Sequence, residues 1–274
     1  MDMKWMRNSL ILPALIIILS GSWSFAGSEL ITLQPRPNVK LKVLIIEPEK
    51  PKAVLILYAG GLGKLDLSST FGITNIGDKY KKDFSVRTRE KFVENGFVVA
   101  LPDSPSDHPD GIGPWHRTSE VHSKEMQYIV SYLKKRYTLP VWIAGISSSS
   151  FTVANAGITL EGQINGVIFA SSVVKSNPKW KFEKCPAGVL NMELSSIKIP
   201  VLIAAHKEDG CVGTPPDGAE LIRKALTSAP KVEVKYYTGG SSPISGACEP
   251  LSQHGFLGIE DQVVADMVAF IRAN

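Results

Sequence analysis

Short apolar segments alternate with amphipathic segments along most of this chain. The segments Ala53–Tyr58 (AVLILY) and Gly166–Ala170 (GVIFA) are apolar throughout, which is typical of strands buried on both faces of a sheet. Between them, Ser119–Arg136 repeats apolar residues at helical spacing and predicts an amphipathic helix. The same patterns predict further strands at 96–101, 140–144, 200–205 and 232–237, and further helices at 86–95, from 148, at 217–226 and at 259–272.

This alternation predicts a single α/β domain built around a mostly parallel, doubly wound sheet. Strands that are apolar throughout need helices on both faces of the sheet, and alternating strands and helices give parallel strands. Residues 39–46 alternate polar and apolar before they turn apolar, which predicts a strand at the edge of the sheet. Residues 171–199 lie between two predicted strands and predict a short excursion over the sheet, so the expected lid is minimal or absent.

The first 26 residues have the layout of an export signal. Lys4 and Arg7 give a basic start, an apolar run covers Leu10–Leu19, and Ser24–Ala26 has the small-x-small pattern of a cleavage site. A membrane-spanning helix needs about 20 apolar residues, so this run is too short for an anchor. We therefore expect a cleaved signal peptide at residues 1–26 and a periplasmic or secreted protein without a stable membrane anchor.

Composition narrows the partners of the remaining domain, residues 27–274. Hydrophobic residues make up 44% of the chain, which is enough for a substantial core. The formal charge is +4 and falls to +3 without the signal peptide (4 − 2 + 1), and the basic residues form no stripe interleaved with aromatic ones. We therefore expect no nucleic-acid partner.

A cluster of serines follows the strand predicted at 140–144. Ser147 lies two residues after Gly145, between this strand and the next helix, and a strand, a sharp turn and a helix around a central serine form a nucleophile elbow. Ser149 stands where such elbows usually have a second glycine. Four consecutive serines also fit a helix N-cap, because serine hydroxyls accept hydrogen bonds from the free N–H groups at a helix start.

An acidic residue and a histidine follow later strands. Asp209 lies in the loop after the strand at 200–205, with Glu208 as its rival, and His254 lies in a glycine-containing loop before the last helix. Each has an ordinary interpretation, an Asp-Gly turn or an exposed loop histidine. The order of serine, acid and histidine, each after a predicted strand, nevertheless predicts a triad in which Asp209 orients His254 and His254 activates Ser147.

A glycine-rich loop, Ala59–Gly63, follows the strand at 53–58. In a site of this kind, a backbone N–H from that loop and the N–H after the nucleophile bind the developing oxyanion. The sequence therefore predicts an oxyanion hole at Gly61 and Ser148, with Leu62 as a close alternative. The loop lacks the spacing and the Gly-Lys-Ser/Thr ending of a phosphate-binding loop.

Three cysteines occur in this exported chain, in a setting where disulfides persist. Cys211 lies two residues after Asp209, and Cys248 lies six residues before His254. If the triad is correct, these loops are neighbours, so we expect a Cys211–Cys248 disulfide that leaves Cys185 free. The alternative is three buried, reduced thiols.

These features together resemble the α/β-hydrolase superfamily, and most of all its small, lidless, dienelactone-hydrolase-like bacterial serine esterases. The resemblance covers the mature region and rests on the motifs at Ala59–Gly63, Asp103–Asp107, Gly145–Ser149, His206–Cys211 and His254–Phe256. Dienelactone hydrolases have a cysteine nucleophile where this chain has Ser147, so their substrate does not carry over. The resemblance implies the α/β-hydrolase fold and hydrolysis of a small-molecule carboxylic ester through an acyl-enzyme, with no cofactor and no metal.

The loop after the strand at 96–101 holds further candidates. His108 and His116 occur near three aspartates, but their spacing matches no common zinc pattern, so we expect no metal site. Trp115 and His116 are candidates for lining the substrate cleft, with packing in the core or on the surface as the alternative.

Two rival functions remain open. A peptidase or amidase of the same fold usually carries a large extra domain that controls access, and the sequence shows no such domain. A catalytically inactive binding protein is disfavoured by the intact order of serine, aspartate and histidine. The leading hypothesis is therefore an exported serine esterase.

Overall fold

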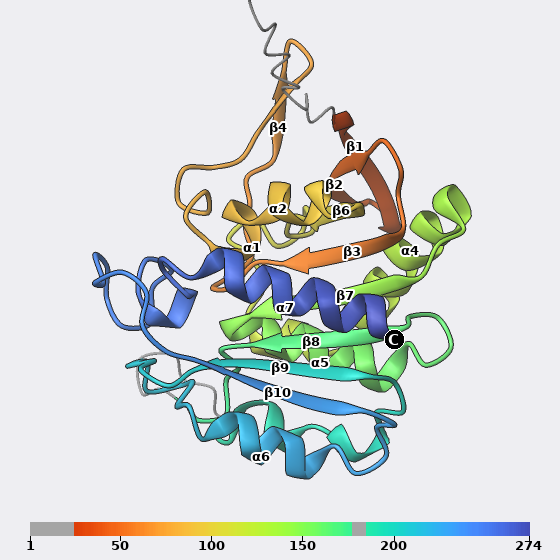
Figure 1. Cartoon of the computed structure of the whole chain (residues 1–274). Coiled ribbons are helices and arrows are strands. Elements are labelled where there is room, and N and C mark those ends of the chain that lie inside the picture. Colours follow the sequence, from red (N-terminus) through yellow and green to blue (C-terminus); the bar gives the residue numbers. More distant parts are fainter. Residues whose placement is uncertain (1–24, 177–184) are drawn as a thin grey trace, which may run out of the picture.

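Eight strands form one sheet in the order β1-β2-β6-β3-β7-β8-β9-β10 in the computed structural model, which describes residues 25–176 and 185–274 (Figure 1). Strands β1 and β2 pair antiparallel, β2 and β6 pair antiparallel, and every other neighbouring pair is parallel. The predicted mostly parallel sheet is confirmed. The predicted signal peptide, apart from Phe25 and Ala26, lies outside the described residues.

The strands of this sheet are β1 (Phe25–Arg36), β2 (Val39–Pro48), β3 (Ala53–Tyr58), β6 (Phe97–Pro102), β7 (Val141–Ile146), β8 (Gly166–Ala170), β9 (Val201–His206) and β10 (Val232–Tyr237), and a separate hairpin consists of β4 (Ser68–Thr70) and β5 (Ile73–Asn75). The α-helices are α1 (Phe84–Arg87), α2 (Arg89–Glu94), α3 (Pro114–Arg117), α4 (Glu120–Tyr137), α5 (Ser150–Thr159), α6 (Gly218–Ala225) and α7 (Glu260–Ala273). Short 3₁₀ turns occupy Ser147–Ser149, Gly188–Asn191, Leu194–Ser196 and Gln253–Gly255.

Helices cover both faces of the sheet, as the apolar strands require. Alternate side chains of β3 enter two separate cores: Val54 and Ile56 pack in one, and Leu55 and Leu57 pack in the other. The first core includes residues of α4, α5 and α6, and the second includes residues of α1, α2 and α7. The two-sided burial of each strand is what makes the sheet doubly wound.

The N-terminal edge of the sheet differs from the sequence prediction. The strand at 39–46 is not an edge strand, because β1 pairs along it and occupies the edge instead. Strand β1 was missed because it is mostly exposed or half-buried and so carries little hydrophobic signal. The helix predicted at 86–95 is also divided into α1 and α2, with Thr88 between them.

The carboxyl ends of the parallel strands converge on one edge of the sheet, toward which the arrows of β3 and β8 point at the left of Figure 1. Ligands of open α/β sheets bind at this edge. The loop that precedes α7 lies at the same edge (Figure 1). Among the described residues, no helix combines the length and apolar character needed to cross a membrane.

Candidate active site

Ser147 occupies a sharp turn between β7 and α5. Its φ is 57°, in the left-handed region that costs a non-glycine residue roughly 1–2 kcal/mol. A Cβ atom on Gly145 would lie 2.5 Å from the hydroxyl oxygen of Ser149, so glycine at that position lets the strand and the following helix pass closely. The geometry is that of a nucleophile elbow.

The four consecutive serines have four different surroundings. The hydroxyl of Ser148 donates to the carbonyl of Gly61, and that of Ser149 lies 2.9 and 2.8 Å from carbonyl oxygens at the ends of β3 and β7. The hydroxyl of Ser150 accepts an N–H from the loop after β8 at 3.1 Å. Ser147 is half-buried and is the one of the four that lines the cavity described below. Ser149 therefore replaces the usual glycine by bonding to the backbone around it.

His254 and Asp209 meet although 45 positions separate them in the sequence. Nδ1 of His254 lies 2.9 Å from Oδ2 of Asp209, and both side chains are buried. The other carboxylate oxygen of Asp209 accepts the N–H of Cys211 at 2.8 Å. The carbonyl of His254 accepts the Ser171 hydroxyl at 2.8 Å, which anchors the histidine loop to the end of β8. Both carboxylate oxygens of Asp209 thus have hydrogen-bond partners, one of them the His254 imidazole.

A threonine that was not predicted from the sequence contacts both Asp209 and His254. Oγ1 of Thr214 lies 2.8 Å from Oδ2 of Asp209 and 3.0 Å from Nδ1 of His254. Its position five residues after Asp209 gives no signal, because the contact depends on how the loop folds back. The rival acid, Glu208, points elsewhere: its exposed carboxylate accepts the N–H of Gly239 at 3.0 Å.

A disulfide joins Cys211 to Cys248, as predicted, across 37 positions of the sequence. Cys185 is free and half-buried. The disulfide connects the loop that carries Asp209 to the long loop before His254. The two loops that supply the acid and the histidine are therefore tied covalently.

Ser147 and His254 line one cavity of about 560 Å³. One wall is the glycine-rich loop after β3, a second is the segment from Lys79 to Phe84, and a third comes from Ile244 to Leu251. The cavity is open to solvent and large enough for a small organic substrate. Gly61 and Leu62 also line it, so the structure brings most of the predicted site residues to one place.

The N–H groups of the glycine-rich loop differ in whether they have a hydrogen-bond acceptor. Gly60 donates its N–H to Oδ2 of Asp83 at 3.0 Å, and Leu62 donates its N–H to the Tyr80 hydroxyl at 3.2 Å. Between them, the N–H of Gly61 has no hydrogen-bond partner among the described residues. Burial raises the pKa of Asp83, although the backbone N–H groups it accepts act in the opposite direction.

The carbonyl groups of the same loop face a buried guanidinium. Nη2 of Arg117 lies 3.3 Å from the carbonyl oxygen of Ala59 and 3.4 Å from that of Gly61. Burial lowers the pKa of Arg117 to about 10, which leaves the side chain charged at neutral pH. Arg117 therefore holds the carbonyl groups of the peptides that precede and follow the Gly61 N–H. Asp83 accepts the N–H of the preceding peptide, and Tyr80 accepts the N–H of the following one.

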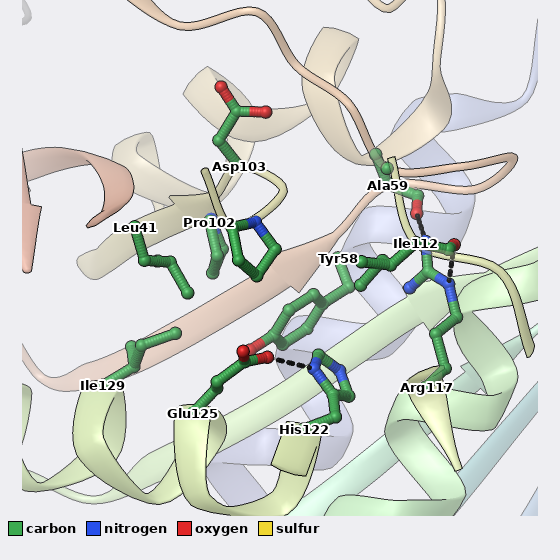
Figure 2. A pocket seen from close by; sticks show the side chains of 12 residues that line it. Leu41, Tyr58, Ala59, Pro102, Asp103, Ile112, Arg117, His122, Glu125 and Ile129 are labelled. Carbon is green, nitrogen blue, oxygen red and sulfur yellow. Dashed lines mark hydrogen bonds and ion pairs between the residues drawn. The ribbon is translucent and has the colours of Figure 1, made fainter. Parts of the chain in front are cut away.

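A second polar cluster consists of Arg36, His116, His122 and Glu125 and adjoins Tyr58 at the end of β3; Figure 2 shows its His122 and Glu125. Nε2 of His116 and Nδ1 of His122 both lie near Oε2 of Glu125, at 2.9 and 3.1 Å, and Arg36 donates to the other carboxylate oxygen at 3.0 Å. Burial lowers the pKa of His122 to about 4. The hydroxyl of Tyr58 points toward Glu125 in Figure 2 but has no hydrogen-bond partner within the described part of the chain.

The two residues predicted to contact substrate do not line the Ser147 cavity. His116 is 2% exposed and belongs to the second cluster, whereas Trp115 is 63% exposed on the surface. The cavity within that cluster has a volume of about 10 Å³. That is room for about one water molecule, which is too small for an ester.

The second cluster also contains a group of three side chains of types that can ligate a metal ion. Ligand atoms of His116, His122 and Glu125 lie within 4.8 Å of one another. Both histidine nitrogens already bond to Oε2 of Glu125, however, and the cations Arg36 and Arg117 flank the cluster. Adjacent positive charges disfavour a bound cation, so we propose no metal there.

Comparisons with known proteins place the fold among hydrolases. No family model matches the chain, and no curated protein is significantly similar to it in sequence. An esterase of Pyrococcus furiosus is 14% identical with a TM-score of 0.62, over 90% of this chain and 92% of that one. A thermostable carboxyl esterase of Bacillus coagulans is 17% identical with a TM-score of 0.62, over 90% and 98%.

A dipeptidyl peptidase 4 of Porphyromonas gingivalis is 13% identical with a TM-score of 0.60, over 92% of this chain but 36% of the peptidase chain. This chain therefore corresponds to about a third of that peptidase and to nearly the full length of the two esterases. The sheet order, the elbow at Ser147 and these structural similarities establish that the chain has the α/β-hydrolase fold.

Proposed function

We propose that this protein is an exported serine hydrolase that cleaves a carboxylic ester through Ser147, His254 and Asp209. The observation that carries the proposal is the shared cavity: a serine with a φ of 57° and a histidine bonded to a buried aspartate line the same open space. Neither feature alone would suffice. Strained serines occur in other tight turns, and His–carboxylate pairs occur elsewhere in this chain.

The proposed reaction begins when Ser147 attacks the ester carbonyl and His254 takes its proton. His254 then protonates the leaving alcohol, and water releases the acid from the acyl-enzyme by the same steps in reverse. Asp209 accepts the Nδ1–H of His254 and stabilises the imidazolium, and the Thr214 hydroxyl also donates to Asp209. No step needs a cofactor.

The tetrahedral oxyanion would bind two backbone N–H groups. Gly61 is favoured over Leu62, because the N–H of Leu62 is already bonded to Tyr80. Ser148 supplies the second N–H, from the first turn of a helix, where N–H groups lack intrahelical partners. Loss of one such donor typically costs about 3 kcal/mol of transition-state stabilisation.

The test is labelling of the purified protein with a fluorophosphonate probe, followed by mapping of the labelled peptide by mass spectrometry. We expect one adduct at Ser147 that disappears in Ser147→Ala. The folded Ser148→Ala protein is the matched control and should still be labelled. An unlabelled native protein would contradict the triad and favour a binding role, and an adduct on Ser148 would move the nucleophile by one position.

A peptidase is the second candidate, since a dipeptidyl peptidase shares the fold. The open cavity and the near-complete overlap with two esterases favour an ester. A panel of aryl esters and matching aryl amides separates the two: we expect ester hydrolysis to be faster by far more than the intrinsic reactivity difference.

Export is part of the proposal, with residues 1–26 as the signal peptide and 27–274 as the mature domain. It is supported by the basic and apolar start of the sequence and by the disulfide between Cys211 and Cys248. N-terminal sequencing of protein recovered from an export-competent host should give Gly27 as the first residue. An intact Met1 in the recovered protein would contradict it.

A further inference from the structure

Two lysines stand on one wall of the Ser147 cavity. Lys79 and Lys82 both line it, within the segment that leads into α1. The N–H of Tyr80 bonds to the carbonyl of Gly77 at 3.0 Å, and that of Asp83 bonds to the carbonyl of Tyr80 at 3.0 Å, so the segment runs in consecutive tight turns. In such turns, residues three positions apart lie on the same side.

The neighbouring charges of this segment lie on a different side and neutralise each other. Nζ of Lys81 lies 2.7 Å from Oδ1 of Asp78, and neither residue lines the cavity. Lys79 and Lys82, in contrast, have no carboxylate partner among the described residues. The segment thus pairs Lys81 with a carboxylate and leaves Lys79 and Lys82 exposed among the residues that line the cavity, with Nζ of Lys79 5.8 Å from the centre of the Tyr80 ring.

The acidic residues of the cavity do not cancel this charge locally. Asp83 is buried and its two carboxylate oxygens accept the N–H groups of Gly60 and Ser85. Glu249 is exposed in the wall formed by Ile244 to Leu251, and its carboxylate accepts the N–H of Gly246 at 3.2 Å. The wall formed by Lys79 to Phe84 is therefore positively charged.

We propose that the substrate is an ester that carries a carboxylate or another anionic group, which binds at Lys79 and Lys82. This inference rests on the proposed esterase function and adds the substrate class. Two unpaired ammonium groups at a cavity mouth raise the local concentration of an anion and attract it once bound. The charged group belongs either to the acyl part or to the alcohol part, and the two cases are separable.

The experiment compares kcat/KM for matched esters. The acyl pair is the para-nitrophenyl monoester of glutaric acid against para-nitrophenyl pentanoate. The alcohol pair is the pentanoate ester of para-hydroxybenzoate against that of its methyl ester. Each is measured with the native protein, with Lys79→Met/Lys82→Met, and with Lys81→Met, the matched control whose ammonium is paired outside the cavity.

We expect one charged ester to exceed its neutral partner by about tenfold in the native protein, because two nearby charges act on it at low salt. The double variant should lose this preference, Lys81→Met should retain it, and added salt should weaken it. Equal preferences in the native protein and the double variant, or an equal loss in Lys81→Met, would overturn the inference while leaving the esterase intact. Hydrolysis of none of the four esters would contradict the proposed function and the inference with it.

Discussion

Two regions of this molecule contain nearly the same chemistry and differ in what surrounds it. In one, His254 lies 2.9 Å from Asp209; in the other, His116 and His122 lie 2.9 and 3.1 Å from Glu125. All five side chains are buried. His254 lines an open cavity of about 560 Å³, whereas His122 and Glu125 line one of about 10 Å³.

The comparison shows that a His–carboxylate contact does not by itself identify an active site. What distinguishes the first region is an open cavity and a serine with positive φ on the same cavity. The second region holds Arg117, which in turn contacts the carbonyls of the glycine-rich loop. We interpret it as the support that fixes the loop, so the two regions should respond differently to the same substitution.

The largest expected difference is in activity. His254→Ala should lower kcat for an aryl ester by about 10⁴-fold or more, because the general base of the proposed triad is lost, with little change in stability. His122→Ala should mainly lower the free energy of unfolding, because it leaves Glu125 with one fewer donor in a buried site. Steady-state kinetics and urea unfolding of both variants would check this. A comparable loss of kcat in a stably folded His122→Ala would break the distinction.

Removal of the disulfide, which joins the Asp209 and His254 loops, should lower the free energy of unfolding. Cys211→Ser/Cys248→Ser should lose about 4 kcal/mol of unfolding free energy, since a cross-link across 37 positions restricts the unfolded chain. Cys185→Ser, which changes the free cysteine, should leave stability nearly unchanged. Urea unfolding measures both variants. A loss below about 1 kcal/mol in the double variant would contradict this expectation.

Acid should destabilise the second polar cluster, called the support cluster below, through protonation of His122. Burial lowers the pKa of His122 from 6.5 to about 4. Between these values the unfolded chain binds a proton that the folded chain does not, so stability falls as the pH drops through this window, by about 2–3 kcal/mol from pH 7 to pH 4.5.

His122→Gln should remove this part of the pH dependence, as measured by urea unfolding at the two pH values. The remaining pH dependence belongs to other groups, including Glu125, whose pKa is held low by hydrogen bonds from His116 and His122 against the effect of burial. An identical pH dependence in the native protein and the variant would contradict the assignment.

The smallest expected effect is a decrease in kcat on loss of one of two buried tyrosine hydroxyls. Tyr80→Phe should lower kcat by about tenfold with little change in KM, because the Leu62 N–H loses its acceptor and the adjacent Gly61 peptide is held less firmly. Tyr58→Phe is the control, since its hydroxyl has no partner among the described residues and its removal should not lower stability. Equal kcat values in the two variants would argue against Tyr80 as a positioning residue.

The periodicity of apolar residues was enough to predict most of the fold. Apolar strands such as AVLILY bury both faces, and that requirement leaves few architectures besides a doubly wound sheet. The order of Ser147, Asp209 and His254, each after a predicted strand, led to the proposed triad, which stays a prediction. The Cys211–Cys248 pairing followed from the same placement and is confirmed.

Contacts that depend on how side chains pack were decided by tertiary structure alone. Strand β1 was missed because an exposed partner strand carries little apolar signal. Trp115 and His116 share one loop with suitable chemistry, yet packing buries one in the support cluster and leaves the other on the surface. Thr214 was not predictable for the same reason: a hydroxyl becomes significant only when a loop brings it within 3.0 Å of an imidazole, and local sequence does not encode that distance.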